Sequence, residues 1–201
     1  MRAERQQQQS MEGQPTQPGA DIRPMPPSGE NYRRAAVLLL LYPRGGEDYV
    51  VFMRRTDTVE HHKGQISLPG GAQDSDDPDP IYTALRESHE ELGIEPGDVQ
   101  VLGTLDEVYV PVSGFVITPV VGRLKPGRRP SGLTFKPSPQ EVAEVIEVPL
   151  RILSEEAVHR TELRTTHGIT HTVHYYTYGP YEIWGATARI LYDFLSRSQA
   201  K

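Results

Sequence analysis

Three glutamates that lie close together in the sequence are the residues best placed to do chemistry as a group. Glu90 and Glu91 follow Glu87 by three and four positions, so on a helix the side chains lie next to one another. Clustered carboxylate oxygens are ligands that Mg²⁺ and Mn²⁺ prefer. A solvated acidic face is the alternative interpretation, because like charges at this spacing cost only about 0.2–0.5 kcal/mol per pair. The surrounding residues decide between the two.

The residues around these glutamates favour a site for an anionic ligand. Gly70 and Gly71 follow Pro69 in a loop that can bring its backbone close to a phosphate. Arg86 directly precedes the first glutamate, and we expect it to orient the acidic face as an ion-pair partner rather than to clamp the substrate. This context predicts a divalent metal site rather than a solvated face.

The helix that carries the glutamates is predicted over residues 81–92. Asp79-Pro80 is a typical helix start, and Gly93 lies just past the last turn. A different face from that of the glutamates is predicted to be buried. Its residues recur at helical spacing and are Ile81, Ala84, Leu85, Ser88 and Leu92.

Most of the other predicted elements are strands. Apolar runs bounded by turn residues predict strands over 35–42, 49–54, 65–68, 99–110, 115–124, 142–148, 171–178 and 181–184, the last two as a hairpin. Two further helices are predicted, a short one over 151–157 and a long one over 185–197. This order predicts an α/β (α+β) fold, an α/β/α sandwich in which a mixed sheet lies between helices.

Composition separates an N-terminal tail from a single domain. Residues 1–31 are rich in Gln and Pro and poor in apolar side chains, so we expect a disordered tail that is dispensable for activity and stability. Residues 32–201 are numerous enough to bury one core. The chain has no cysteine, which excludes disulfides, cysteine–zinc sites and cysteine nucleophiles.

Charge and hydropathy limit the partners that the chain can have. Its net charge of −6 argues against a general nucleic-acid surface. The longest apolar run, residues 35–41, is too short to cross a membrane, and the N-terminus lacks the apolar stretch of a signal peptide. We therefore expect a cytoplasmic protein that binds neither nucleic acid nor membranes, and a homodimer is left open.

The segment from Gly71 to Ile94 resembles the Nudix box, G-x5-E-x7-R-E-U-x-E-E-x-G-U, in which U is an aliphatic residue. The charged and glycine positions match from Arg86 onward, whereas Ser88 stands at an aliphatic position. Asp77 stands for the first glutamate of the pattern, one residue further from the arginine. The resemblance implies a Nudix hydrolase, which cleaves a nucleoside diphosphate linked to another moiety. It also implies Mg²⁺ or Mn²⁺ held by Glu87, Glu90 and Glu91, with catalysis by Glu90, Glu91 and Arg86.

A second signature, just upstream, resembles that of the coenzyme A pyrophosphatases within this superfamily. Residues 55–71 follow the spacing R-[SA]-x3-R-x3-G-x3-F-P-G-G, with Glu60 where the pattern has its second arginine. Residues 113–122 and 183–191 resemble the same branch. The substrate-binding residues that the resemblance implies are Arg55, Lys63, Gly64, Gly70 and Gly71, with Lys63 able to compensate for the reversed charge.

The resemblance to this branch implies a particular reaction. It is metal-dependent hydrolysis of the diphosphate linkage of coenzyme A or its thioesters, giving 3′,5′-ADP and 4′-phosphopantetheine or its acyl form. Glu60 leaves open a pyrophosphatase for ADP-ribose, NDP-sugars or modified nucleotides. A catalytically silent nucleotide-binding Nudix module is a third alternative, which the complete set of helix glutamates together with Arg86 disfavours.

Residues outside these motifs give weaker signals. Glu141, ahead of the predicted strand over 142–148, is a candidate general base or further metal ligand, with a solvated loop residue as the alternative. His171 and His174 point to opposite faces of a strand, so they predict no zinc site. Tyr181 and Trp184 are expected to pack in the core rather than to form a stacking platform.

Overall fold

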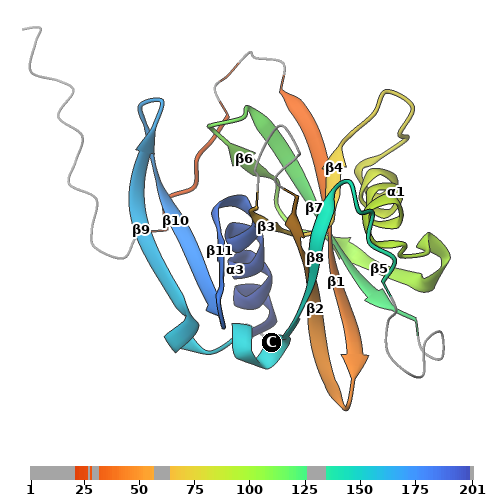
Figure 1. Ribbon diagram of the computed structural model, residues 1–201. Coiled ribbons are helices and arrows are strands. Elements are labelled where there is room, and N and C mark those ends of the chain that lie inside the picture. The colour runs from red at the N-terminus through yellow and green to blue at the C-terminus, as the bar shows by residue number, and fades with distance from the viewer. Residues whose placement is uncertain (1–20, 27, 29–31, 57–63, 126–134, 200–201) are drawn as a thin grey trace, which may run out of the picture.

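The computed structural model describes residues 21–26, 28, 32–56, 64–125 and 135–199 of the chain (Figure 1). Its strands are β1 (Arg33–Arg44), β2 (Glu47–Arg55), β3 (Ile66–Ser67), β4 (Gly70–Ala72), β5 (Val99–Thr104), β6 (Val108–Val110), β7 (Phe115–Leu124), β8 (Val142–Pro149), β9 (His159–Thr166), β10 (Ile169–Tyr178) and β11 (Tyr181–Trp184). Its helices are α1 (Pro80–Leu92), α2 (Leu150–Leu153) and α3 (Gly185–Gln199), with 3₁₀ turns η1 (Pro96–Asp98) and η2 (Glu156–Val158). In this described part of the chain no helix has the length and apolar character that crossing a membrane requires.

The larger sheet is mixed and has eight strands, with β1 at its centre. Its main path runs β3-β2-β1-β7-β5, while β4 pairs with β1, β6 with β7 and β8 with β2. β1 and β7 run parallel. In β1, Leu39 and Leu41 belong to the core on one face of the sheet, whereas Leu38 and Leu40 belong to the core on the other. Because successive side chains of a strand point to opposite faces, the continuous apolar run is that of a strand buried on both sides.

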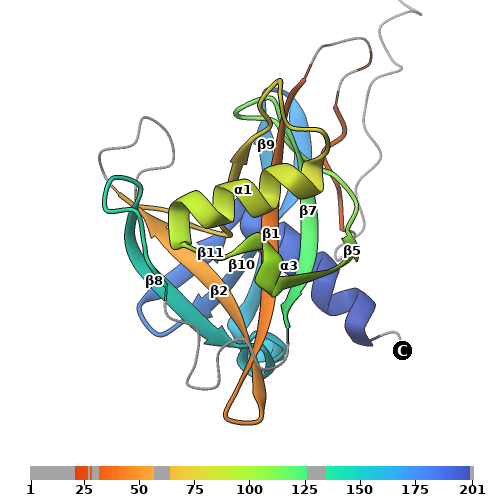
Figure 2. The same cartoon turned by 90° about the vertical axis from the view of Figure 1, so that its right-hand side faces the viewer.

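Helices α1 and α3 cover the two faces of this sheet, which confirms the predicted α/β/α layering. Ala84 and Leu92 of α1 pack into one core, and Leu191 and Leu195 of α3 pack into the other. Figure 2 shows α1 lying across β1 in front of the sheet, with α3 behind it. The apolar stripes of the two predicted helices are therefore their buried faces.

A second sheet adds a layer that the sequence did not predict. It has three strands in the order β11-β10-β9 and packs on the side of α3 away from the larger sheet (Figure 1). Tyr176 and Ile183 join the core beneath α3, and the His174 ring stacks on the Tyr192 ring with centroids 4.2 Å apart. Helix α3 is consequently buried between two sheets.

The predicted and observed elements differ at four places. The strand predicted over 99–110 is two strands, β5 and β6, and the helix predicted over 151–157 divides into α2 and η2. β4 was missed because it is three residues long and begins with two glycines, which are uncommon in strands. β9 was missed because its sequence, HRTELRTT, is polar and exposed along most of its length and lacks an apolar alternation.

The N-terminal residues that the structure describes lie against the domain. The backbone N–H of Thr172 donates to the carbonyl of Ile22 at 2.9 Å, and Asp21 binds the buried Arg189. The expectation of a tail without contacts up to residue 31 therefore does not hold for residues 21–26, because a charge pair offsets the entropy of ordering them. Residues 1–20 lie outside the described residues.

Candidate active site

Helix α1 forms where it was predicted because both of its ends are capped. Asp79 Oδ1 accepts a hydrogen bond from the backbone N–H of Tyr82 at 2.8 Å. Gly93 ends the helix in the left-handed region, with φ at 67°, and its N–H donates to the carbonyls of the last turn. The position of the three glutamates is thus fixed from both ends of the helix.

The three glutamates are buried to different extents, which corrects the expectation that they share one outer face. Glu91 is 2% exposed, the side chain of Glu87 is 19% exposed and that of Glu90 is 53% exposed. Ser88, at an aliphatic position of the Nudix pattern, is buried and donates its hydroxyl to the carbonyl of Ala84 at 2.6 Å. Glu91 is therefore on the buried side of α1, Glu87 is partly buried, and Glu90 faces solvent.

Glu91 is a buried carboxylate with few compensating groups. Its Oε2 accepts a hydrogen bond from the backbone N–H of Gly70 at 2.8 Å, and its Oε1 lies 3.5 Å from Nη1 of Arg55. Burial raises the pKa of Glu91 to about 8, and the charges of Glu87 and Glu141 add to this effect, against the opposing influence of Gly70 and Arg55. In the absence of another cation, this site favours the neutral form of the acid.

The two glycines of the loop are needed for two different close approaches. A Cβ atom at Gly71 would overlap the carboxylate of Glu87. A Cβ atom at Gly70, whose φ is 144°, would overlap the carbonyl oxygen of Ala36 in β1. The structure therefore brings the predicted glycine loop into direct contact with the predicted glutamates.

Arg86 is an ion-pair partner within this acidic group, as its sequence position predicted. Its Nε and Nη2 donate to the two carboxylate oxygens of Asp77 at 3.0 and 2.9 Å. Its Nη1 donates to Glu87 Oε1 at 2.8 Å and to Glu90 Oε2 at 3.1 Å. The Arg86 guanidinium, outweighing burial, lowers the pKa of Asp77 to about 2 with help from Thr83. Asp77 thus holds Arg86, and Arg86 holds two of the glutamates.

Glu141 reaches the same region from the loop that precedes β8. Its carbonyl accepts a hydrogen bond from the N–H of Thr56 at 3.0 Å, which ties this loop to the end of β2. Its side chain is exposed, and its charge contributes to the raised pKa values of Glu87 and Glu91. The structure therefore places the candidate base near the two less exposed glutamates of α1.

The donor set of this region suits a hard divalent cation. Among the described residues no three His, Asp or Glu side chains are grouped closely enough to hold a metal as they stand, since Arg86 occupies Glu87 and Glu90. Burial nevertheless raises the pKa of both Glu87 and Glu91, so a cation bound by them would relieve their mutual repulsion. Carboxylate oxygens are also the ligand type that Mg²⁺ and Mn²⁺ prefer.

Comparison with known families identifies the family to which this chain belongs. The family model described as the NUDIX domain matches residues 32–169. The chain belongs to the Nudix family. It is a hydrolase that acts on pyrophosphate bonds, and Nudix hydrolases generally use divalent metal ions.

Related proteins support the same assignment. The chain is 38% identical to an uncharacterized Nudix hydrolase, NudL, of Photorhabdus laumondii over 179 residues, which cover 88% of this chain and 91% of that protein. It is 35% identical over 164 residues to the mitochondrial Nudix hydrolase 15 of Arabidopsis thaliana, covering 79% of this chain and 56% of that protein. The MutT protein of Methanosarcina mazei has a similar fold, with a TM-score of 0.54 at 19% identity over 86% of this chain and 99% of that one.

The loop that follows β2 carries the other residues of the predicted Nudix substrate site. Arg55 ends β2, its side chain is 25% exposed, and its buried Nε has no hydrogen-bond partner among the described residues. Gly64 lies in the left-handed region, with φ at 65°, where the chain turns toward β3. Lys63 and Glu60 lie outside the described residues. Arg55 therefore places a partly exposed guanidinium beside the Nudix glutamates.

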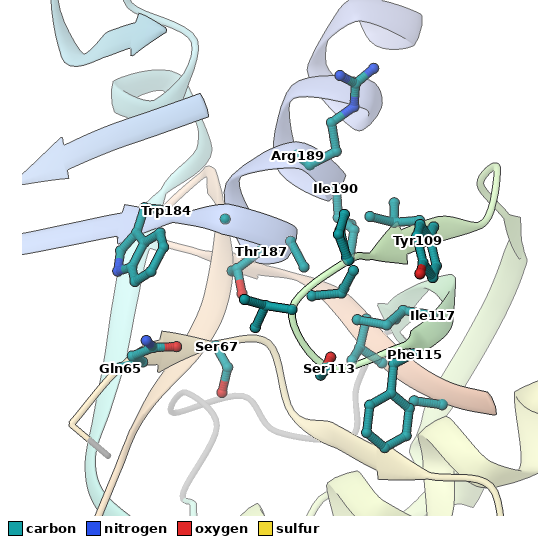
Figure 3. A pocket seen from close by; sticks show the side chains of 18 of the residues that line it. Gln65, Ser67, Tyr109, Ser113, Phe115, Ile117, Trp184, Thr187, Arg189 and Ile190 are labelled. Carbon is teal, nitrogen blue, oxygen red and sulfur yellow. The ribbon is translucent and has the colours of Figure 1, made fainter. Parts of the chain in front are cut away.

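A cavity of about 710 Å³ adjoins the Nudix glutamates on the other side of the glycine loop. Arg55, Gly70 and Gly71 belong to its lining, so the same residues contact both the cavity and the acidic group. Figure 3 shows its wall, with Trp184 and Gln65 at one end and Tyr109 and Phe115 at the other. Its lining is mostly apolar, and such a volume suits a drug-sized organic group.

Several cavity residues were not predicted from the sequence as site residues. Trp184, expected in the core, is 37% exposed, lines the cavity and stacks on Tyr175 with ring centroids 6.5 Å apart. Tyr181 is partly buried and donates to Glu144 at 2.6 Å, away from the cavity lining. The position of Trp184 at the end of a strand, directly before a glycine that opens α3, is the signal that could have indicated a site.

Proposed function

We propose that this Nudix hydrolase cleaves the diphosphate linkage of coenzyme A or its thioesters, with Mg²⁺ or Mn²⁺, to 3′,5′-ADP and 4′-phosphopantetheine or its acyl form. The observation that carries the proposal is the junction at Arg55, Gly70 and Gly71, where a mostly apolar cavity meets an acidic group suited to a metal. A diphosphate that carries a long, mostly uncharged organic arm needs such a junction. The signature over residues 55–71 supports the same substrate class.

In this proposal the glutamates of α1 hold the metal. Glu87, Glu90 and Glu91 supply the carboxylates, the N–H of Gly70 orients Glu91, and Arg86 orients the other two. When bound, the metal neutralises the diphosphate and lowers the pKa of a water for in-line attack at phosphorus. Arg86 would act as a positioning residue for this group, because its Nε and Nη2 are held by Asp77 independently of Glu87 and Glu90.

Glu141 is the proposed general base. Its carboxylate takes one proton from the attacking water, and the phosphorus–oxygen bond of the diphosphate breaks as the new one forms. Its exposed side chain lies near Glu87 and Glu91 without being held by Arg86. A further metal ligand is the alternative role. The pH profile of a Glu141→Gln variant distinguishes the two roles, because loss of the base removes the titrating limb that the wild-type profile shows, whereas loss of one metal ligand lowers the rate and leaves that limb in place.

Arg55 and the glycine loop are proposed to bind the phosphates. The guanidinium of Arg55, which is partly exposed and lines the cavity, provides a positive charge for a phosphate oxygen. Gly70 and Gly71 line the cavity, and the absence of their side chains lets β1 and the Glu87 carboxylate pack directly against the loop, which keeps the acidic group beside the proposed phosphate site. Lys63 and Gly64, which precede these glycines in the sequence, complete the predicted substrate-binding set.

A substrate panel with Mg²⁺ and Mn²⁺ tests the proposal. We expect 3′,5′-ADP from coenzyme A and its thioesters by chromatography, at higher kcat/KM than for ADP-ribose or NDP-sugars. A preference for ADP-ribose or an NDP-sugar would refute coenzyme A as the substrate but would leave the assignment as a Nudix hydrolase unchanged. The Glu91→Gln variant should lower kcat by several orders of magnitude with the fold intact, since it removes only the ligand charge. The matched control is Glu95→Gln, an exposed residue just beyond α1 that should retain full activity.

A further inference from the structure

Residues 21–26, here called the N-terminal strap, extend the small sheet at its open edge. β11 pairs with β10 only over Tyr175–Tyr178, which leaves the edge of β10 free beyond that point. The strap occupies this edge, because Ile22 accepts from the N–H of Thr172 at 2.9 Å and its own N–H donates to the Thr172 hydroxyl at 2.9 Å. In Figure 1 the strap is the red-orange coil beside β10.

Asp21 latches the strap to a buried guanidinium of α3. Its Oδ1 and Oδ2 accept from Nη1 and Nη2 of Arg189 at 2.5 and 2.6 Å, a bidentate pair. Arg189 is 5% exposed, and His174 Nε2 lies 3.1 Å from Asp21 Oδ1. Although burial opposes it, the Arg189 and His174 contacts hold the pKa of Asp21 below its ordinary value. The latch is therefore a short-range charge pair in a largely buried place.

The strap forms one end of the cavity beside the Nudix site. Pro24 of the strap lines this cavity together with Val173 of β10 and Ile190 of α3. Arg189 also contributes to the lining, and Figure 3 shows its guanidinium pointing away from the cavity. Since Asp21 and Asp193 pair with that guanidinium, its charge is not directed into the cavity. Pro24, Val173 and Ile190 are apolar and suit an aliphatic group, while Thr172 and His171 of β10 also belong to the lining.

We propose that the N-terminal strap is the end wall of the substrate cavity and limits the length of the uncharged, aliphatic part of the substrate. This inference rests on the proposed function, in which the diphosphate binds at Arg55 and the glycine loop and the organic arm enters the cavity. Asp21 is then a positioning residue that contacts no substrate. Pro24 is the specificity-determining residue that the latch holds in place.

The experiment measures chain-length preference in the full chain. Asp21→Asn keeps the size of the side chain but removes the charge that pairs with Arg189. The strap is then held less firmly, and the cavity can accept longer groups. We expect the ratio of kcat/KM for a long-chain acyl-coenzyme A to that for acetyl-coenzyme A to rise about tenfold. Pro24→Ala, which shortens the wall and keeps the latch, should raise the same ratio by a smaller factor. The matched control is Asp48→Asn, which breaks the pair of Asp48 with Arg123 outside the cavity lining and should leave the ratio unchanged.

A binding measurement separates the strap from the reaction. Trp184 is the sole tryptophan and lines the cavity, so its fluorescence reports occupancy without turnover. Acyl-pantetheines, which carry no diphosphate, should bind wild type with short chains preferred and Asp21→Asn with that preference relaxed. An unchanged ratio and unchanged preference in both strap variants would overturn the inference even if coenzyme A is hydrolysed. A relaxed preference for acyl-pantetheines with no hydrolysis of coenzyme A would support the strap and refute the proposed function, whereas hydrolysis of coenzyme A with no binding of any acyl-pantetheine would overturn the inference about the strap alone.

Discussion

Two clusters in this protein are both built from carboxylates and guanidiniums, but they differ in the ratio of negative to positive charges. The α3 cluster contains Asp21, Arg23, Arg189 and Asp193, in which two carboxylates face two guanidiniums. The α1 cluster contains Asp77, Arg86, Glu87, Glu90 and Glu91. Three of its four carboxylates share the guanidinium of Arg86, and Glu91 lies 3.5 Å from that of Arg55. Only the α3 cluster is neutral without an added cation.

The difference in balance gives the clusters different properties. In the α3 cluster the pKa of Asp21 lies below its ordinary value, so ionised partners stabilise one another. In the α1 cluster burial raises the pKa of Glu91 to about 8, so its ionised form is disfavoured until a further cation is present. The comparison indicates that a balanced buried cluster holds structure, whereas an unbalanced one is prepared for a ligand.

Removal of metal should have the largest effect and should act on the α1 cluster alone. Chelation with EDTA is expected to abolish hydrolysis, and Mg²⁺ or Mn²⁺ should restore it, because the acidic group lacks its balancing charge without them. The melting curve of the chelated protein should remain cooperative, since the α3 cluster needs no metal. Turnover by rigorously metal-free protein would contradict the assignment of the cluster.

Substitution of the central arginine should have the largest effect on stability in the α3 cluster. Arg189→Met leaves the carboxylates of Asp21 and Asp193 without their shared partner in a buried place, which should cost about 3 kcal/mol of the free energy of unfolding. Urea unfolding measures this loss. Arg189→Lys is the control and should recover part of it, and a loss below about 1 kcal/mol would show that the cluster contributes little.

Within the α1 cluster, the pH dependence of stability should have opposite signs for Glu91 and for Asp77. The folded pKa of Glu91 lies above its ordinary value of 4.5, so its contribution is fully present below pH 4.5 and is lost as pH rises through about 8. In metal-free protein Glu91→Gln should therefore become more stable than wild type by more than about 1 kcal/mol between pH 5 and pH 9. A constant difference across this range in urea unfolding would contradict the raised pKa.

Asp77 should show the smallest effect, in the other direction. Its folded pKa of about 2 lies below its ordinary value of 3.8, so the stability it contributes is present above pH 3.8 and is lost as pH falls through about 2. Asp77→Asn should therefore destabilise the protein at pH 6 and less so at pH 3. Equal destabilisation at both values would mean that the loss comes from hydrogen bonds to Thr83 and Arg86 rather than from charge.

The elements of the α1 cluster could be predicted because their signals are local. The caps at Asp79 and Gly93 and the spacing of the glutamates all belong to one helix and its ends, and β1 contains a continuous apolar run over residues 35–42. The burial of Glu91 could not be predicted in this way, since it depends on how closely β4 approaches α1.

The α3 cluster could not be predicted, because it joins residues that lie even further apart in the sequence. Asp21 and Arg189 are separated by 168 positions, and the segment around Asp21 has the composition of a disordered tail. No periodicity links a single carboxylate to a guanidinium across the whole chain. The lining of the cavity could not be predicted from the sequence either, because Trp184, Phe115 and Pro24 come from three distant segments.

The most direct test of the α1 cluster is calorimetric titration of the metal-free protein with Mn²⁺. Wild type should bind Mn²⁺, Glu91→Gln should bind it at least about tenfold more weakly, and Glu95→Gln should bind it as wild type does. Proton release on binding should increase as the buffer pH is lowered from 8 to 6, because Glu91 must lose its proton to bind the metal. Equal Mn²⁺ affinity of wild type and Glu91→Gln would contradict the claim that this unbalanced cluster is the metal site.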